Sequence, residues 1–366
     1  MEIDKLLSNY KNKKVLITGH TGFKGSWLTI WLHYLGAEVI GYALDPQTPK
    51  DNYVLSKLEN LISKDYRGDI RDKDRIKDLF KEEKPEIVFH LAAQPLVLEG
   101  FKDPVYTHET NIMGTVNILD AIRTSNFAIT SVFITSDKCY DNKEWVWGYR
   151  ETDPMGGHDP YSASKGACEL IISSYLNSFF SPGNYKTHQK AIASVRAGNV
   201  IGGGDWADNR IVPDFIKAVE DNKKIQVRNP MAVRPWQHVL EPLGGYLMLG
   251  AKMMEDPGSY SGAWNFGPTH NNLVIVQTLV KKLIEFYGKG EWQDISSRQK
   301  KHEATLLSLD ISKANQLLKW CPVLSLNETI QLTVEWYKRY STEDACSLGL
   351  QQIKGYMEKW KSLKKI

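Results

Sequence analysis

The chain has 366 residues, enough to bury a sizeable core in two domains or in one large domain with an elaborated second lobe. Its 46 basic and 43 acidic residues leave a net charge of +3, which argues against a protein that binds nucleic acid or an anionic membrane surface. The four cysteines stand far apart without a C-x-x-C pair, and no run of about 18 apolar residues occurs. The sequence therefore predicts no metal site, no disulfide framework and no membrane span, and a soluble cytoplasmic protein.

A β-rich run over residues 14–18 is followed by a glycine-rich turn and then by an apolar-periodic segment over 27–35. This order predicts a strand, a tight turn and a helix. The glycines are spaced G-x-x-G-x-x-G, which lets the backbone approach a pyrophosphate at the helix N-terminus. We interpret the turn as a dinucleotide site, with a purely structural turn as the alternative. Its candidate cofactor-binding residues are Gly19, Thr21, Gly22, Phe23, Lys24 and Gly25.

A second predicted strand, 38–44, leads into Asp45, twenty residues after Gly25. A carboxylate at this position hydrogen-bonds a ribose 2′-hydroxyl and repels a 2′-phosphate, so it favours NAD over NADP. The alternative is an aspartate that only opens a loop before Pro46.

Residues 67–70 separate a helical stretch from a second one over 73–83, and Asp69 is placed to approach an adenine. The apolar run 86–93 is typical of a strand buried on both faces of a parallel sheet, and the small residues at its end leave room for a cofactor. The candidate cofactor-binding residues in this part are Asp69, Ile70, Leu91, Ala92 and Ala93.

A helical span over 104–123 precedes a strand, 131–134, that runs into Thr135, Ser136, Asp137 and Lys138. Strands that alternate with helices predict an α/β fold with a doubly wound parallel sheet. Ligands of such sheets bind at the carboxyl ends of the strands, which is where Asp137 falls.

Tyr161 and Lys165 stand four residues apart in a predicted helix that begins at Pro160, so they share one face. A nearby cation favours phenolate, and a tyrosine activated in this way takes a proton from a sugar hydroxyl at neutral pH. A surface pair is the alternative for this motif by itself. The ionisable residues that end the preceding strand favour the catalytic interpretation.

Farther along, a strand over 191–196 is followed by a glycine-rich loop, 197–205. The segment 234–241 looks like a recognition segment, because Arg234 suits a diphosphate and His238 is able to line a pocket. A structural turn and a rim charge are the alternatives. Helical periodicity returns over 276–287 and 326–340.

Four motifs resemble those of the extended short-chain dehydrogenase/reductases that act on nucleotide sugars. They are Thr18-Gly-x-x-Gly-Phe-x-Gly25, His90-Leu-Ala-Ala93, Tyr161-x-x-x-Lys165 and Arg196-x-x-Asn199-Val. Three longer stretches, 136–149, 198–206 and 234–242, resemble the CDP-glucose 4,6-dehydratases within that group.

The resemblance implies a Rossmann-type NAD-binding domain over 1–195, with a returning segment over about 233–268. It implies a smaller mixed α/β substrate domain over 196–232 and 269–366. It also implies bound NAD, a CDP-glucose substrate, a homodimer and a place in deoxysugar biosynthesis, including that of lipopolysaccharide O-antigens.

The implied reaction begins when Tyr161 deprotonates the sugar 4-hydroxyl while NAD takes a hydride from C4. The 4-ketone acidifies C5, water leaves from C6 with Asp137 as the acid, and the hydride returns to C6. Ser136 is expected to bind the 4-hydroxyl, and Lys165 to hold the nicotinamide ribose and the phenolate. The catalytic candidates are Ser136, Asp137, Lys138, Tyr161 and Lys165, and the substrate-binding candidates are Ser136, Asn199, Arg210, Arg234 and His238.

Lys138 departs from the wider group of 4,6-dehydratases, which carry Glu as the base that removes the C5 proton. A lysine acts as a base only when neutral, and its usual pKa of about 10.4 keeps it charged at pH 7. The alternative is that Lys138 only pairs with Asp137. Three other functions stay open for the chain, namely a nucleotide-sugar 4-epimerase, a 4,6-dehydratase for another nucleoside diphosphate glucose, and a non-catalytic NAD(H)-binding protein.

Overall fold

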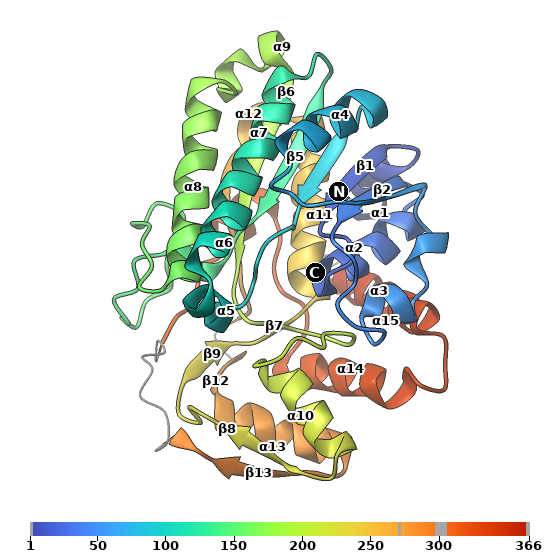
Figure 1. The fold of residues 1–366 in the computed structure, drawn as a ribbon, viewed down its shortest axis with the longest axis vertical. Coiled ribbons are helices and arrows are strands. Elements are labelled where there is room, and N and C mark those ends of the chain that lie inside the picture. Colours follow the sequence, from blue (N-terminus) through green and yellow to red (C-terminus); the bar gives the residue numbers. More distant parts are fainter. Residues whose placement is uncertain (1–2, 270–271, 297–305, 364–366) are drawn as a thin grey trace.

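The computed structural model describes residues 3–269, 272–296 and 306–363, and its centre is a seven-stranded parallel sheet (Figure 1). The strand order is β11-β6-β5-β4-β1-β2-β3, so the direction of winding reverses between β1 and β4. The strands are β1 (Lys14–Thr18), β2 (Glu38–Ala43), β3 (Lys64–Arg67), β4 (Ile87–His90), β5 (Ile129–Ile134), β6 (Lys190–Ala197) and β11 (Gly262–Phe266). The predicted doubly wound parallel sheet is confirmed, with its ligand crevice expected beside the β1–β4 reversal.

Helices cover both faces of this sheet because its strands are apolar on both sides (Figure 1). In β1, Val15 and Ile17 belong to one core cluster, whereas Leu16 between them belongs to the other. Helices α2 (Phe23–Tyr34) and α11 (Leu240–Glu255) contribute to the first cluster. Helices α4 (Lys73–Glu83), α7 (Gly114–Thr124) and α8 (Pro160–Ser178) contribute to the second.

The start of α8 follows from local chemistry. Asp159 is the N-cap, and its carboxylate accepts a hydrogen bond of 2.9 Å from the Ser162 amide. Pro160 occupies the first turn, where the missing amide hydrogen is no loss. The cap therefore fixes the helix that carries Tyr161 and Lys165.

The expectation of helix before residue 67 was wrong in part. The structure has α3 (Asn52–Leu55), the 3-10 turn η2 (Leu58–Asn60) and then strand β3, which pairs with β2. Because β3 is the edge strand and is mostly exposed, it lacks the apolar pattern that marks the central strands.

A smaller mixed α/β lobe lies below the sheet in Figure 1 and contains three two-stranded pairs. The pairs are β7 (Val200–Ile201) with β10 (Gln237–His238), β9 (Val233–Pro235) with β12 (Leu273–Ile275), and β8 (Lys224–Val227) with β13 (Glu291–Asp294). Its helices are α10 (Ile211–Glu220), α13 (Val276–Tyr287) and α14 (Leu326–Arg339). The helical periodicity read over 276–287 and 326–340 is confirmed.

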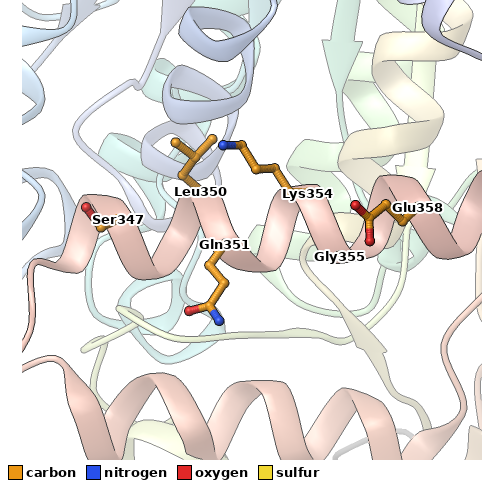
Figure 2. A pocket seen from close by; sticks show the side chains of 6 residues that line it. All are labelled: Ser347, Leu350, Gln351, Lys354, Gly355 and Glu358. Carbon is orange, nitrogen blue, oxygen red and sulfur yellow. The ribbon is translucent and has the colours of Figure 1, made fainter.

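The helix α15 (Ala345–Leu363) bears on the predicted division into domains. The prediction placed it in the substrate domain, and it packs both against α14 of the smaller lobe and against α2, where the rings of Trp31 and Tyr356 meet edge to face at 5.6 Å. Figure 2 shows a shallow hollow along α15, lined by Ser347, Leu350, Gln351, Lys354, Gly355 and Glu358. All six residues come from this one helix, so the hollow is separate from the strand ends. The domain boundaries stay a prediction.

The remaining elements are short connections or caps. They are α1 (Ile3–Leu7), η1 (Ser8–Tyr10), α5 (Val97–Lys102), α6 (Pro104–His108), η3 (Glu109–Met113), η4 (Asp137–Cys139), η5 (Pro182–Asn184), α9 (Tyr185–His188), α12 (Pro257–Tyr260) and η8 (Ala314–Leu318). Within the described part of the chain, no helix is long and apolar enough to cross a membrane.

Candidate active site

The turn between β1 and α2 brings backbone very close to backbone. Gly19 has a φ of 78°, and a Cβ there would lie 2.8 Å from the amide nitrogen of Ala92. A Cβ on Gly25 would lie 2.1 Å from the carbonyl oxygen of Gly19, so the helix packs directly on the turn. Gly22, by contrast, is exposed and stands immediately before α2. The first amides of α2 are thus open to a ligand, and the cradle fits a pyrophosphate.

The end of β4 forms the wall beside this turn. Leu91 donates its amide hydrogen to the Thr18 carbonyl oxygen at 3.0 Å, and Ala92 donates to the Thr18 hydroxyl oxygen at 3.3 Å. Burial lowers the pKa of His90 to about 3, so its ring is neutral. Leu91, Ala92 and Ala93 are half-buried beside the glycine turn, where sequence placed them, and their cofactor contacts stay a prediction.

Two aspartates lie farther along the same edge of the sheet. Asp45 follows β2 and is largely exposed, with Oδ1 3.3 Å from Nε of Arg67. Asp69 is held by Arg71, whose guanidinium donates to the carboxylate at 2.7 Å and lowers the pKa of Asp69. Asp45 therefore has a basic neighbour, Arg67, that the sequence did not reveal.

Three of the five catalytic candidates, Ser136, Asp137 and Lys138, directly follow β5; together with Tyr161 and Lys165 they are called the acid/base group. Ser136 caps the turn η4, where its hydroxyl accepts from the Lys138 amide at 3.2 Å and donates to Asp137 Oδ1 at 3.0 Å. Asp137 is only 1% exposed, and its Oδ2 has no hydrogen-bond partner among the described residues. A buried carboxylate oxygen without a donor fits a site that receives a hydroxyl group from a ligand.

Tyr161 and Lys165 lie on α8, which packs against η4. Burial raises the pKa of Tyr161 to about 12, opposed by a hydrogen bond with Ser136 and by the charge of Arg210. Lys165 donates to the Ile134 carbonyl oxygen at 3.5 Å, and burial lowers its pKa. The structure thus brings the five catalytic candidates together at the carboxyl end of β5.

The substrate-binding candidates are spread around this group. A Cβ on Gly198 would lie 3.2 Å from Asp137 Oδ2, so the loop that carries Asn199 lies against the carboxyl group of Asp137. Arg210 forms an ion pair of 2.9 Å with Asp205 and lies in the electrostatic field of Tyr161. Both positions suit a sugar diphosphate beside the acid/base group.

Arg234 and His238 are less clearly placed. Arg234 donates to the Val233 carbonyl oxygen at 2.9 Å from the short strand β9. His238 is fully buried with its ring 6.0 Å from that of Trp27, and burial lowers its pKa to about 3. The His238 ring is thus shut off from solvent, and contact with substrate stays a prediction.

The structure places two charged residues, Lys24 and Glu169, near the catalytic candidates, which the sequence had not indicated. Burial, together with the charges of Arg210 and Lys165, lowers the pKa of Lys24 to about 7, so its amino group lies near the acid/base group. Glu169 was passed over, although it lies one helical turn after Lys165 on the same face. The four-residue spacing from Lys165 to Glu169 is the sequence signal that could have identified Glu169.

A model of the family described as GDP-mannose 4,6 dehydratase matches residues 16–333. The chain is 47% identical to the CDP-glucose 4,6-dehydratase of Salmonella typhimurium over 349 residues, which cover 95% of this chain and 97% of that relative.

Two solved structures share the fold. The UDP-glucose 4-epimerase of Thermotoga maritima, solved with UDP-glucose, superposes with a TM-score of 0.73 at 25% identity and covers 90% of this chain and 100% of its own. The dTDP-glucose 4,6-dehydratase of Streptomyces venezuelae, solved with NAD, has a TM-score of 0.75 at 21% identity and covers 91% and 99%, which shows likeness of fold. The chain therefore belongs to the GDP-mannose 4,6 dehydratase family, within the short-chain dehydrogenase/reductase superfamily.

Proposed function

We propose that this protein is a hydro-lyase that converts CDP-glucose to CDP-4-keto-6-deoxyglucose and uses NAD as a bound cofactor. The observation that carries the proposal is the buried, unpartnered Oδ2 of Asp137, adjacent in sequence to Lys138 and packed against the helix of Tyr161. An epimerase has no step that needs such an acid, because it eliminates no water. The 47% identity to a CDP-glucose 4,6-dehydratase supports the choice of substrate.

NAD would be held by residues of the turn after β1 and of the end of β4. The open amides at the start of α2 would face the pyrophosphate, and Asp45 would face a ribose hydroxyl. When bound, NAD supplies the hydride acceptor for C4 of the sugar and the hydride donor for C6.

Tyr161 is the base for the sugar 4-hydroxyl. Burial raises the pKa of Tyr161 to about 12, so positive charge close to the phenol is needed to lower this pKa before Tyr161 can act as a base at neutral pH. Arg210 supplies such charge, and a hydrogen bond with Ser136 also opposes the rise. Lys165, four residues after Tyr161 on the same helix, is proposed to add to this charge. Ser136 is therefore placed to bind the same hydroxyl that Tyr161 deprotonates.

Asp137 and Lys138 act after C4 has become a ketone. Asp137 donates a proton to the C6 hydroxyl as it leaves as water, and its buried carboxyl has an oxygen without a partner among the described residues to meet that hydroxyl. Lys138, in neutral form, removes the C5 proton that the ketone has acidified. The two residues therefore divide the acid and base work of one elimination.

The diphosphate of the substrate would be bound by Asn199, Arg210 and Arg234. Arg210 is already oriented by Asp205 at 2.9 Å, which leaves further guanidinium hydrogens for phosphate oxygens. His238 is proposed to support this wall from behind, since its ring is fully buried.

The mass of the product tests the proposal. The purified protein with NAD is incubated separately with CDP-glucose, UDP-glucose and dTDP-glucose, and the molecular mass of each product is measured by mass spectrometry. We expect a product lighter by one water from CDP-glucose. A product of unchanged mass with an inverted C4 would instead indicate an epimerase, turnover of another nucleotide alone would change the substrate, and no turnover would indicate an NAD(H)-binding protein.

We also propose a homodimer that works in the cytoplasm, where both NAD and nucleotide sugars are made, and supplies deoxysugar pathways such as that of lipopolysaccharide O-antigens. Large apolar side chains gather on α5 to α8, where they are about half exposed or more: Phe101, Val105, Met113 and Leu170. Helices α5 and α6 and the turn η3 all pack against α8, so the elements that carry these exposed apolar side chains lie together. Light scattering should give twice the mass of the chain, and Val105→Glu with Leu170→Glu should give the monomer.

A further inference from the structure

A buried ion pair joins helix α8 to strand β6 below the acid/base group. Glu169 and Arg196 are 4% and 3% exposed, and Oε2 of Glu169 lies 2.7 Å from Nη2 of Arg196. The same oxygen accepts a hydrogen bond of 2.7 Å from the Ser194 hydroxyl. A buried charge pair of this kind is held in one geometry by its hydrogen bonds, and removal of one partner leaves the other charge unpaired.

The pair holds both ends of the segment that carries Ser136, Asp137 and Lys138. At the beginning of this segment, Thr135 donates its hydroxyl hydrogen to Oε1 of Glu169. At its end, Arg196 donates to the Tyr140 hydroxyl oxygen at 2.6 Å and lies over the Tyr140 ring at 4.9 Å. Four residues, 136–139, thus lie between two side chains that contact one ion pair.

The hydrogen bonds continue from Tyr140 into the long loop beyond it. The Tyr140 hydroxyl donates to Oδ1 of Asn265 at 2.8 Å, and the Asn265 amide donates to the carbonyl oxygens of Tyr149 at 2.8 Å and Asp310 at 3.1 Å. Arg196 also donates to the carbonyl oxygen of Glu151 at 3.1 Å. The loop over 140–151 is therefore held to the sheet by Arg196 on β6 and Asn265 on β11, and Glu169 fixes the position of Arg196.

Tyr161 and Lys165 depend on the pair much less. They lie within a 19-residue helix, whose own backbone hydrogen bonds and Asp159 cap hold them in place. Ser136, Asp137 and Lys138, in contrast, occupy a loop and a single 3-10 turn. Loss of the pair should therefore displace the acid and base of the elimination more than the base of the oxidation.

We propose that Glu169 and Arg196 are positioning residues that hold the segment 136–138 in register with α8, and that water elimination depends on them more than C4 oxidation does. Neither side chain reaches the reacting atoms. The kinetic part of this inference rests on the proposed function, whereas the structural part does not.

The test uses Glu169→Gln and the double variant Glu169→Gln/Arg196→Met, because the double variant removes both charges and avoids a lone buried guanidinium. Glu241→Gln is the matched control, since Glu241 is also a buried carboxylate but contacts Val323, Leu324 and Tyr356 instead. With CDP-glucose, we expect kcat to fall about tenfold to a hundredfold in both test variants with KM little changed. Enzyme-bound NADH should accumulate, because oxidation continues while elimination is slow.

Recovery of wild-type kcat in the double variant would overturn the proposal, since the charges would then matter only for folding. An equal loss of NADH formation and water elimination would overturn the selective effect on the segment.

Hydrogen–deuterium exchange separates this proposal from the proposed function. Peptides that cover residues 135–151 should exchange faster in both test variants than in wild type and in Glu241→Gln. Unchanged exchange would refute the structural claim whatever substrate the enzyme uses. A wild-type protein that leaves CDP-glucose intact would refute the proposed function alone.

Discussion

Lys138 and Asp137 lie next to each other at the carboxyl end of β5, with 3.9 Å between the lysine Nζ and the aspartate Oδ1. The side chain of Asp137 is 2% exposed, whereas that of Lys138 is 37% exposed. A distance of 3.9 Å leaves the ammonium group without a tight partner in Asp137. If Lys138 is the proposed base, its partly exposed side chain would approach C5 of a bound sugar.

Replacement of Lys138 by alanine should separate the two halves of the reaction. Tyr161 and Ser136 remain, so the variant should still form enzyme-bound NADH when CDP-glucose is added. Water loss and C5 proton exchange with deuterated solvent should fall by about 10²-fold or more, the usual contribution of a general base. Absorbance of bound NADH and mass spectrometry of the sugar measure the two halves.

Lys143→Ala is the control for this variant, because Lys143 lies on the same loop and pairs with Asp141 at 2.8 Å on the surface. It should behave as wild type. Near-normal C5 exchange in Lys138→Ala would rule out the base role, and loss of NADH formation as well would assign Lys138 to binding.

The path of the hydride offers a second prediction. Because the acid/base group is buried at one end of the sheet, oxidation and reduction should occur in one closed site. Substrate labelled with deuterium at C4 should give product labelled at C6, even with excess unlabelled NADH in solution. Appearance of the label in the external NADH would point to an ordinary dehydrogenase.

The third prediction concerns cofactor choice. Asp45 should favour NAD, and the Arg67 guanidinium that it holds at 3.3 Å would become available to a 2′-phosphate once the carboxylate is gone. Asp45→Ala should therefore weaken NAD binding and strengthen NADP binding, each by about tenfold, the value of one hydrogen bond to a charged group. Fluorescence titration with both cofactors measures this. Equal affinity of the wild-type protein for NAD and NADP would refute the ribose assignment, and Asp45→Ala/Arg67→Ala should lose the gain in NADP binding.

The sequence predicted the central sheet well because its information is local. Glycine spacing, the apolar runs of β1 and β4, and the Tyr161 helix with its Pro160 start each depend on neighbours in the chain. Edge strand β3 escaped prediction because its exposed residues lack the apolar pattern, and the packing of α15 against both α2 and α14 could not be predicted because a helical pattern does not identify the packing partners. The ion pair of Glu169 with Arg196 could not be predicted from spacing, since 27 residues separate its members.

The last prediction concerns stability and pH, and its source is Glu241. Burial raises the pKa of this carboxyl from 4.5 to about 7, although the Leu324 and Val323 amides and the Tyr356 hydroxyl donate hydrogen bonds that oppose the rise. A carboxyl whose folded pKa exceeds its unfolded pKa binds more protons when folded. Its contribution is therefore fully present below pH 4.5 and is lost as the pH rises toward about 7.

The loss amounts to at most about 3.5 kcal/mol, since the pKa rises from 4.5 to about 7 and each pKa unit corresponds to about 1.4 kcal/mol. Glu241→Gln cannot ionise, yet its side-chain oxygen still accepts from the two amides. The free energy of unfolding of wild type relative to Glu241→Gln should therefore decrease between about pH 5 and about pH 8. Urea titrations of both proteins across this range measure the difference, and a difference that stays constant or grows with pH would show that Glu241 is ionised in the folded protein.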